Sequence, residues 1–365
     1  MNLPNAARVA VFAGPGKPFE FRALPLPELA EGEVLVAVSL ATICGSDLHT
    51  FEGRRNEPTP CVLGHEATGQ VIACGDGRDP ELVGRRVTWT LADSCGCCRP
   101  CRDWALPQKC ERLFKYGHAP LSSGSGLNGC YASHLVLRPG TTVIPLPESV
   151  TDAMAAPANC ALATMVAATE PLAHGGGTAL IQGAGLLGLY GCALLRQMGW
   201  DRVLVADLNP ARLEFVSNFG GEPLSVSDVA QLRSGSVDAV LEATGHPEVV
   251  PDGIRLLRPG GHYGFVGMVH PNSRLDLTGE AIVRKCLTLR GTHNYAPRHL
   301  HTAIDFLAAQ SSAYPWDSLL SPPFALADLE PAFALARSGR WPRVSVAPSP
   351  NRNSRNVGAR PILGP

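Results

Sequence analysis

One short glycine-rich stretch constrains the fold more than any other part of the chain. The sequence IQGAGLLGLYG places Gly183, Gly185 and Gly188 in the pattern G-x-G-x-x-G. It follows an apolar run, TALIQ, and opens a helix that we predict to begin near Leu186. The first glycine permits the turn, the second lets backbone approach a pyrophosphate, and the third lets helix and strand pack closely. The context predicts a dinucleotide-binding unit; a glycine turn without a ligand is the alternative.

An acidic residue follows at the distance that this motif requires. Asp207 ends the next apolar run, RVLVADL, about 20 residues further on. A carboxylate there accepts hydrogen bonds from both ribose hydroxyls and repels a 2′-phosphate. The free N–H groups at the helix start, around Leu186 and Leu187, would hold the phosphates. The sequence therefore predicts NAD rather than NADP as the cofactor.

The region around the motif is apolar enough to suggest a membrane span as an alternative. HGGGTALIQGAGLLGLYGCALLR carries no Asp, Glu, Lys or Arg before Arg196, but its glycines favour a buried strand, a turn and a helix. The N-terminus lacks the basic start and apolar core of a signal peptide. A formal net charge of −1 gives no basic surface for nucleic acid or anionic membrane. We expect a cytoplasmic protein with neither partner.

The chain of 365 residues is long enough for two domains. Residues 1–160 alternate short apolar runs with turns, as in EVLVAVSLAT and RRVTWTL, which predicts an antiparallel, barrel-like β domain. In residues 161–294 strands alternate with helices, which predicts an α/β domain with a doubly wound parallel sheet. We expect residues 295–346 to return to the first domain. Residues 347–365, rich in Pro, Asn, Ser and Gly, are predicted to be a disordered tail.

Clustered cysteines suggest bound metal. Five of the twelve lie in DSCGCCRPCRDWALPQKC, and clustered cysteines in a cytosolic chain are more often metal ligands than disulfides. Two shorter motifs, ICGSDLH and LGHEATG, add Cys44 and His65. Taken singly, a cysteine is usually a buried small hydrophobe and a histidine a satisfied core or surface group, so either motif alone could be structural.

Together these motifs resemble the zinc-dependent alcohol dehydrogenases of the medium-chain dehydrogenase/reductase superfamily. The resemblance runs from about Val9 to Val346 and rests on C-G-S-D-L-H, G-H-E, the cysteine-rich lobe, the glycine motif and their order. It implies a GroES-like β-barrel catalytic domain and a Rossmann nucleotide-binding domain. It also implies two zinc ions per chain, NAD, an alcohol substrate and a homodimer or homotetramer.

The resemblance assigns a catalytic zinc to Cys44, His65 and Cys160, the last in APANCALATMVAATE. Glu66 matches an acid that sits beside the metal or moves onto it, and Asp47 matches the acid that orients the ligand histidine. Three protein ligands leave one coordination position open, where the metal would lower the pKa of an alcohol.

The resemblance also implies a structural zinc in the cysteine-rich lobe. The spacing C-x2-C-x2-C-x8-C, one residue longer at its end than is usual in the family, assigns the ligands Cys95, Cys98, Cys101 and Cys110. Four thiolates leave no open position. Cys97 is then spare. A redox switch between Cys97 and Cys98 is the alternative, disfavoured because adjacent cysteines seldom form an unstrained disulfide.

The proton and cofactor contacts are likewise carried over from the family. Ser46 would contact the alcohol and pass its proton through the nicotinamide ribose to His49, whose ordinary pKa near neutrality suits a shuttle. The remaining contacts are Arg212 near the adenosine ribose, Thr164, Phe265 and Val266 at the nicotinamide, and Arg343 at the pyrophosphate.

The substrate is left open between several classes. LPQKC with FKYGH, APANCA and RGTHNY resemble a branch of bacterial alcohol dehydrogenases proposed to act in phosphonate breakdown. A hydroxyalkylphosphonate or other anionic alcohol would need cationic donors, and the available ones are Lys115, His118, His293, Arg54 and Arg55. These could instead be solvated surface cations, with a plain alcohol, polyol or threonine-type substrate. A non-catalytic nucleotide- and zinc-binding relative is the alternative of another class, although such a relative would be expected to lose ligands that this chain keeps.

Overall fold

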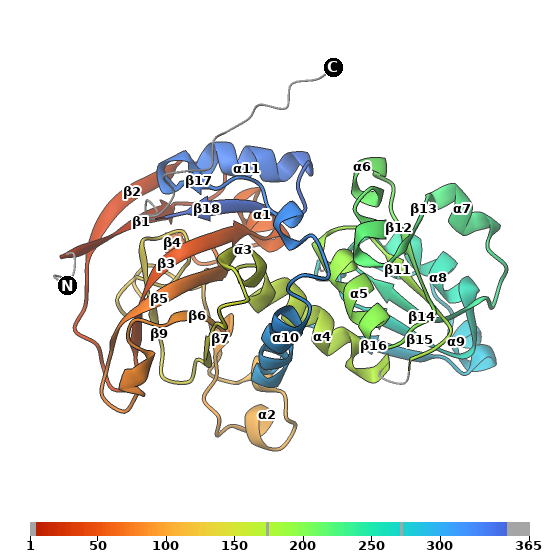
Figure 1. The fold of residues 1–365 in the computed structure, drawn as a ribbon, viewed down its shortest axis with the longest axis horizontal. Coiled ribbons are helices and arrows are strands. Elements are labelled where there is room, and N and C mark those ends of the chain that lie inside the picture. Colours follow the sequence, from red (N-terminus) through yellow and green to blue (C-terminus); the bar gives the residue numbers. More distant parts are fainter. Residues whose placement is uncertain (1–4, 173–174, 271–272, 349–365) are drawn as a thin grey trace.

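The computed structural model describes residues 5–172, 175–270 and 273–348. Its right-hand part in Figure 1 is built on a six-stranded parallel sheet in the order β13-β12-β11-β14-β15-β16. The strands are β11 (Thr178–Gln182), β12 (Arg202–Ala206), β13 (Glu222–Leu224), β14 (Val237–Glu242), β15 (Leu257–Phe265) and β16 (Thr288–Gly291). The strand order reverses direction between β11 and β14, and the carboxyl ends of strands at such a point open a crevice for ligands.

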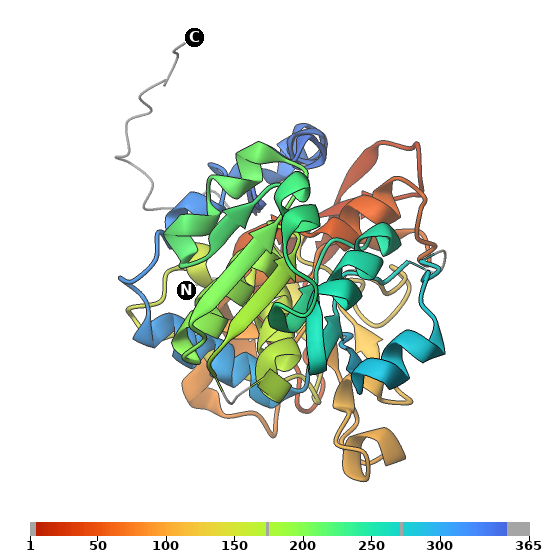
Figure 2. The ribbon, with the colours of Figure 1, turned by 90° about the vertical axis from the view of Figure 1, so that its right-hand side faces the viewer.

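Helices cover both faces of this sheet, as Figure 2 shows. They are α5 (Leu186–Gln197), α6 (Pro210–Leu213), α7 (Val226–Gln231), α8 (Val250–Leu256) and α9 (Gly279–Lys285). The predicted start of α5 at Leu186 is confirmed. Gly183 has a φ of +112°, and a Cβ on Gly188 would lie 1.9 Å from the carbonyl oxygen of Gly183. The motif therefore needs glycine at both positions, the first for backbone conformation and the third for close packing.

The left-hand part of Figure 1 is antiparallel β structure. Its larger sheet has the order β10-β6-β5-β3-β18-β17, with β9 also on β3, and a smaller one has the order β2-β1-β4. The larger sheet comprises β3 (Val34–Ile43), β5 (Glu66–Cys74), β6 (Arg86–Trp89), β9 (His134–Leu137), β10 (Val143–Pro145), β17 (Phe324–Ala325) and β18 (Val344–Ala347). The smaller comprises β1 (Ala6–Phe12), β2 (Phe19–Pro25) and β4 (Cys61–Val62). Helices α1 (Gly45–Phe51) and α11 (Leu329–Ser338) accompany these sheets. Because β18 pairs with β3, the end of the described chain lies back on the first sheet.

A lobe with the short helix α2 (Arg99–Arg102) projects from this β structure at the bottom of Figure 1. Its base is the two-stranded ladder of β7 (Ala92–Asp93) and β8 (Phe114–Lys115). The cysteine-rich sequence is therefore a separate excursion from the sheet, held at its base by strand pairing.

Between the two parts lie α3 (Asp152–Ala155), a π-helix (Ala158–Leu162), α4 (Ala163–Thr169) and α10 (Pro297–Ala309). One buried hydrophobic cluster includes Leu91 and Ile144 of the β structure, Leu186 of α5 and Leu300 of α10. A continuous core thus joins the parallel sheet to the β structure and fixes their relative position.

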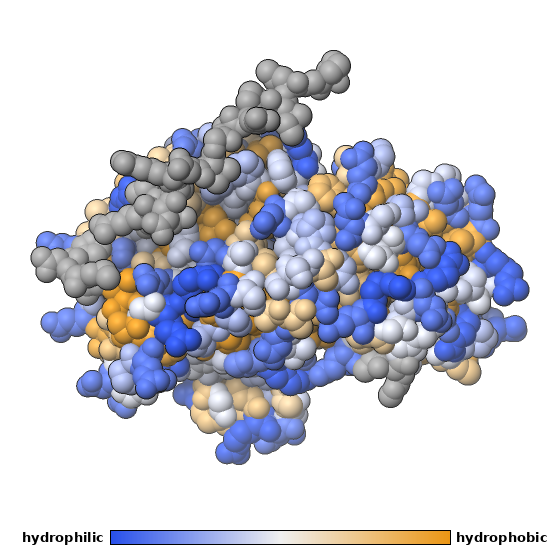
Figure 3. All heavy atoms as spheres, viewed as in Figure 1, coloured by the Kyte–Doolittle hydropathy of each residue, from blue (hydrophilic) through white to orange (hydrophobic). Residues whose placement is uncertain are grey.

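No described helix is long and apolar enough to cross a membrane. On the face drawn in Figure 3, hydrophobic residues are interspersed with hydrophilic ones and form no continuous band. The segment predicted to be a disordered tail lies mostly outside the described residues, from 349 onward, while Ala347 is the last residue of β18.

Candidate functional site

Four potential metal ligands from three separate segments converge where the β structure meets the central helices. Cys44 precedes α1, His65 immediately precedes β5, Glu66 begins that strand, and Cys160 lies in the π-helix. Their ligand atoms all lie within 4.8 Å of one another. Two thiols, an imidazole and a carboxylate suit zinc, which binds sulfur, nitrogen and oxygen in compact tetrahedral sites. The structure therefore brings together the ligand set that the resemblance implied.

Asp47 orients the histidine of this cluster. Its carboxylate lies 3.4 Å from Nδ1 of His65, and both side chains are buried. The carboxylate also accepts hydrogen bonds of 2.9 Å from the backbone N–H of Cys44 and from the hydroxyl of Tyr131. Burial alone would lower the pKa of His65, but the charge of Asp47 raises it to about 10. Nδ1 of His65 thus faces the Asp47 carboxylate, and Nε2 is the ring nitrogen available as a metal ligand.

The two thiols share one hydrogen bond. The contact with Cys160 lowers the pKa of the Cys44 thiol, and the same contact raises that of Cys160. Before metal binds, Cys44 is therefore the more acidic of the pair. A thiolate is the form that binds zinc.

Glu66 is held beside the thiols by a fixed set of donors. Its buried carboxylate accepts hydrogen bonds from Thr42 Oγ1 at 2.6 Å and from Arg343 Nε and Nη2 at 3.0 and 3.1 Å. Burial raises the pKa of Glu66 to about 7, although Arg343 opposes the shift. Arg343 also approaches the Cys44 sulfur at 3.6 Å. The guanidinium thus contacts the metal-ligand cluster directly, which the sequence did not anticipate.

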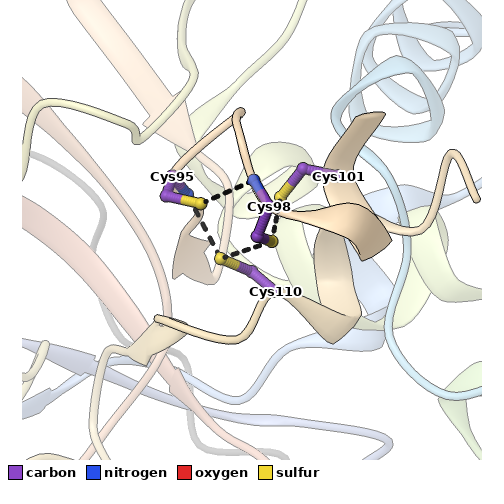
Figure 4. A group of neighbouring side chains, drawn as sticks. All are labelled: Cys95, Cys98, Cys101 and Cys110. Carbon is purple, nitrogen blue, oxygen red and sulfur yellow. Dashed lines mark hydrogen bonds between the residues drawn. The ribbon is translucent and has the colours of Figure 1, made fainter. Parts of the chain in front are cut away.

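The lobe contains a second cluster, drawn in Figure 4, made only of thiols. Cys95, Cys98, Cys101 and Cys110 have sulfur atoms within 4.8 Å of one another, with Cys98 at 3.4 Å from Cys101 and 3.8 Å from Cys110. A zinc tetrahedron with Zn–S bonds of ~2.3 Å has S–S edges of ~3.8 Å. The spacing fits a closed four-thiolate site, and the extra residue before Cys110 does not prevent it.

Backbone N–H groups donate hydrogen bonds to these sulfur atoms and so favour their thiolate form. Cys98 N–H donates to Cys95 Sγ at 3.4 Å, and Cys95 N–H donates to Cys110 Sγ at 3.3 Å. Backbone donors at Cys97 and Cys98 lower the pKa of the Cys95 thiol to about 5. Cys97 itself is exposed, with its sulfur 2.7 Å from Arg112 Nη2. All twelve cysteines are free thiols in this structure.

At the parallel sheet, Asp207 ties the glycine loop to the end of β12. One carboxylate oxygen accepts from the backbone N–H of Ala184 and the other from that of Asn209, each at 2.8 Å. Arg212 Nη1 lies 3.8 Å away. A cavity of about 160 Å³ lies between Gly185 and Leu186 on one side and Arg343 on the other. The proposed phosphate contacts thus face the metal-ligand cluster across the junction of the two parts.

A larger cavity of about 520 Å³ adjoins the carboxyl ends of β15 and β16. Phe265 and Val266, where β15 ends, line it together with His293 and with Lys109 of the lobe. Thr164 is half-buried on α4, and Leu187 is half-buried on α5. Of the predicted cofactor contacts, Gly185, Leu186, Arg212 and Arg343 line the smaller cavity, Phe265 and Val266 line the larger one, and Thr164 and Leu187 line neither.

Ser46 and His49 both lie on α1, which Cys44 precedes. Ser46 Oγ is 3.4 Å from Nε2 of His65. Burial, and then the charge of Arg54, lower the pKa of His49. His49 Nδ1 is buried and has no hydrogen-bond partner among the described residues. The histidine is thus neutral at pH 7, with a ring nitrogen able to take part in a proton relay.

A basic cluster adjoins the metal ligands. Lys115 and Arg55 both lower the pKa values of His118 and His293, after burial. The ring of His118 is buried 5.2 Å from that of His65, so the alternative of a solvated surface cation fails there. Arg55 pairs with Glu57 at 2.6 Å and His293 Nδ1 accepts from Lys109 at 2.5 Å. Arg54 pairs instead with the exposed Glu52 and belongs to another environment.

Sequence reasoning missed several residues around the metal ligands. Tyr131 donates a hydrogen bond to Asp47 from 84 positions away, and no local sequence pattern predicts such a contact. Asn159 contacts the His65 backbone and was visible only as the neighbour of Cys160. Glu57 has no motif of its own, although it lies in the same loop as Arg55.

Comparison with known proteins agrees with the geometry. Residues 30–148 match the alcohol dehydrogenase GroES-like domain, and residues 187–309 match the zinc-binding dehydrogenase family. The chain is 28% identical over 343 residues to an L-threonine 3-dehydrogenase of Legionella pneumophila, covering 88% of this chain and 94% of that protein. It is 29% identical over 349 residues to a probable D-xylulose reductase A of Aspergillus clavatus, covering 90% and 93%. The crystal structure of an alcohol dehydrogenase from Thermotoga maritima matches with a TM-score of 0.87 at 29% identity, covering 94% of this chain and 100% of that one.

The fold and the two ligand clusters define a zinc-containing oxidoreductase that acts on CH–OH groups with a nicotinamide dinucleotide. The chain belongs to the zinc-dependent alcohol dehydrogenase family of the medium-chain dehydrogenases/reductases, with a GroES-like domain followed by a Rossmann-type domain.

Proposed function

We propose that this dehydrogenase oxidises an alcohol that carries a negatively charged group, such as a hydroxyalkylphosphonate, and transfers the hydride to NAD. Cys44, His65 and Cys160 would hold the catalytic zinc, with Glu66 beside it. Zinc bound there would lower the pKa of the alcohol. Ser46 would bind the hydroxyl, and its proton would leave through the ribose to the neutral His49.

The observation that carries the anionic substrate is the state of Lys115. Among the described residues, its ammonium group has no hydrogen bond or ion pair. Burial, and then the charge of Arg55, lower its pKa, and the thiols of Cys160 and Cys44 are near enough to act on it too. Lys115 is half-buried, and a charge partly withdrawn from water is unfavourable unless it is paired. The nearby acid, Glu57, already pairs with Arg55, so an anionic substituent on the substrate would supply the missing partner.

The test compares a 2-hydroxyalkylphosphonate with the same alcohol lacking its phosphonate. We expect kcat/KM to favour the phosphonate by tenfold or more, which is about 1.4 kcal/mol. Lys115→Met should remove most of that preference and leave the neutral alcohol almost unaffected. Lys109→Met is the matched control, since that lysine already contacts His293. Equal turnover of both substrates, unchanged by Lys115→Met, would point to a plain alcohol or polyol instead.

A second candidate is a threonine-type substrate, favoured by the L-threonine 3-dehydrogenases among the relatives. Threonine carries a carboxylate that Lys115 could pair with, but also an ammonium group that Arg55, and Lys115 when protonated, would repel. Including L-threonine and its N-acetyl derivative in the same assay separates the cases. A preference for L-threonine over the N-acetyl form would favour this candidate over the phosphonate.

Further parts of the proposal concern the cofactor and the assembly. Asp207 supports NAD over NADP, with Arg212, Thr164, Phe265, Val266 and Arg343 as additional contacts.

We take residues 1–160 and 295–346 as the catalytic domain and residues 161–294 as the nucleotide-binding domain, supported by the pairing of β18 with β3. A homodimer or homotetramer, inferred from the family resemblance, can be tested by light scattering.

A further inference from the structure

Asn159 lies between two of the ligand-bearing segments. It is fully buried in the π-helix, immediately before Cys160. Its Nδ2 donates to the backbone carbonyls of His65 and Trp89, each at 3.1 Å. Because both partners are acceptors, the NH₂ group and not the oxygen must face them. One amide therefore links the Cys160 segment to the His65 backbone.

The backbone of Asn159 is held in turn by Tyr295. The buried hydroxyl of Tyr295 donates to the carbonyl of Asn159 and accepts from the backbone N–H of Leu91 at 3.2 Å. Tyr295 follows β16, where the chain leaves the parallel sheet. π-helical turns are rare and occur frequently at functional sites. Here the turn that carries Cys160 is fixed on both sides, by its own side chain and by Tyr295.

We propose that Asn159 and Tyr295 are positioning residues for the catalytic metal, forming a clamp that fixes Cys160 relative to His65. The inference rests on the proposed zinc site. His65 and Asn159 are 94 positions apart, so no local structure sets their separation. Metal and catalytic groups need placement to within about 0.5 Å. One hydrogen bond of the Asn159 amide spans this gap to the His65 carbonyl, and the other holds the amide to the Trp89 carbonyl. The hydrogen bond from Tyr295 to the Asn159 carbonyl holds the π-helix in place.

The chain contains a similar pair that does not touch the metal ligands. In the parallel sheet, the buried amide of Gln182 donates to the carbonyl of Val249 at 2.6 Å. It also accepts from the buried hydroxyl of Tyr263 at 2.7 Å. Substitutions in this pair remove comparable buried hydrogen bonds. They therefore report what such a loss does to stability alone.

The experiment measures zinc release to an excess of a colorimetric chelator. Tyr295→Phe and Asn159→Leu test the clamp, and Tyr263→Phe and Gln182→Leu are the controls. Cys44→Ser and Cys98→Ser assign the release phases, because each removes a ligand from one cluster only. We expect the clamp variants to release the catalytic zinc roughly 10- to 100-fold faster, the usual scale for losing an outer partner of a metal ligand. The phase of the four-thiolate zinc should not change.

The controls should lower the unfolding temperature while leaving both release phases as in the wild type. Clamp variants that fold and release both zinc ions at wild-type rates would overturn the clamp and leave the proposed function intact. A wild-type protein without zinc at the Cys44 cluster would overturn both. If Asn159→Leu does not fold, Tyr295→Phe decides, because it removes a single oxygen and keeps the packing of the ring.

Discussion

At the scale of single residues, burial sets the protonation states around the site as much as neighbouring charges do. Burial comes first among the causes that lower the pKa values of Lys115, His118 and His293, and nearby cations add to it. The two imidazoles are consequently neutral at pH 7, and burial favours the same for the ammonium. An anionic substrate would reverse this tendency, because an opposite charge favours the protonated forms. The protonation of Lys115, His118 and His293 therefore depends both on their burial and on the charge of the substrate that binds beside them.

The acid limb of the pH profile for alcohol oxidation should report His49. Burial and Arg54 lower the pKa of His49, so the neutral form that accepts a proton persists below neutral pH. Arg54→Gln removes a repelling charge and should raise this pKa, moving the acid limb of kcat to higher pH. His49→Gln should lower kcat and abolish that limb. A limb that stays in place in Arg54→Gln would show that another group controls it.

Asp207 should control the choice between NAD and NADP. Its carboxylate is fixed by the backbone N–H groups of Ala184 and Asn209, at the end of β12. Asp207→Ala should narrow the ratio of kcat/KM values for the two cofactors by tenfold or more, about 1.4 kcal/mol. Asp207→Asn keeps an acceptor but loses the charge, and it separates repulsion of the 2′-phosphate from loss of the hydrogen bonds. Equal use of NADP by the wild type would contradict the assignment.

At the scale of elements, what the sequence predicted correctly depends on local stereochemistry. The glycine motif predicted the start of α5 because Gly183 needs a positive φ and Gly188 has no room for a Cβ. The four-cysteine spacing likewise brought its thiols together. The partners of these elements were not predictable, because Tyr131 and Asn159 reach their contacts across 84 and 94 positions. Such contacts follow from tertiary packing, which no single segment encodes.

Arg343 shows the same limit for a residue that the sequence did single out. The resemblance placed it at the pyrophosphate, and it does line the cavity beside Gly185. Its bidentate contact with Glu66 joins residues 277 positions apart and emerged only with the fold. The sequence could single out Arg343 as a candidate, whereas its contact with Glu66 could not be predicted from the sequence.

The two zinc sites should separate activity from stability. Cys44→Ser removes a ligand at the open site and should abolish turnover, with about one zinc per chain retained and the fold intact. Cys98→Ser opens the four-thiolate site, where the metal holds a lobe whose base is only the short β7–β8 ladder. It should lower the unfolding temperature by roughly 5 °C, which at about 2–4 °C per kcal/mol corresponds to a loss of about 2 kcal/mol. Elemental analysis with thermal unfolding checks both; active wild-type enzyme with a single zinc would contradict the two-site assignment.

At the scale of the whole molecule, the functional groups lie along the junction between the two parts. The metal-ligand cluster belongs to the β structure and central helices, and the glycine loop belongs to the parallel sheet. The cavity of about 160 Å³ joins them, with Gly185 and Arg212 on one side and Gly45 and Arg343 on the other. A ligand in this cavity would contact both parts at once. Its binding would therefore stabilise the arrangement of the two parts relative to each other, and not only the part that holds the glycine loop.

Nucleotide binding should therefore stabilise the chain as one unit. NAD at 100 times its Kd should add about 2.7 kcal/mol to the free energy of unfolding, because it binds only the folded state. The gain should appear as a single transition moving to higher temperature, since one buried core joins the parts. Arg212→Ala removes a partly exposed guanidinium from the cavity. It should weaken NAD binding by about tenfold, reducing the gain by ~1.4 kcal/mol at the same NAD concentration, while the transition without NAD stays in place. Two transitions, of which NAD shifts only one, would show instead that the parts unfold independently and that the cavity does not couple them.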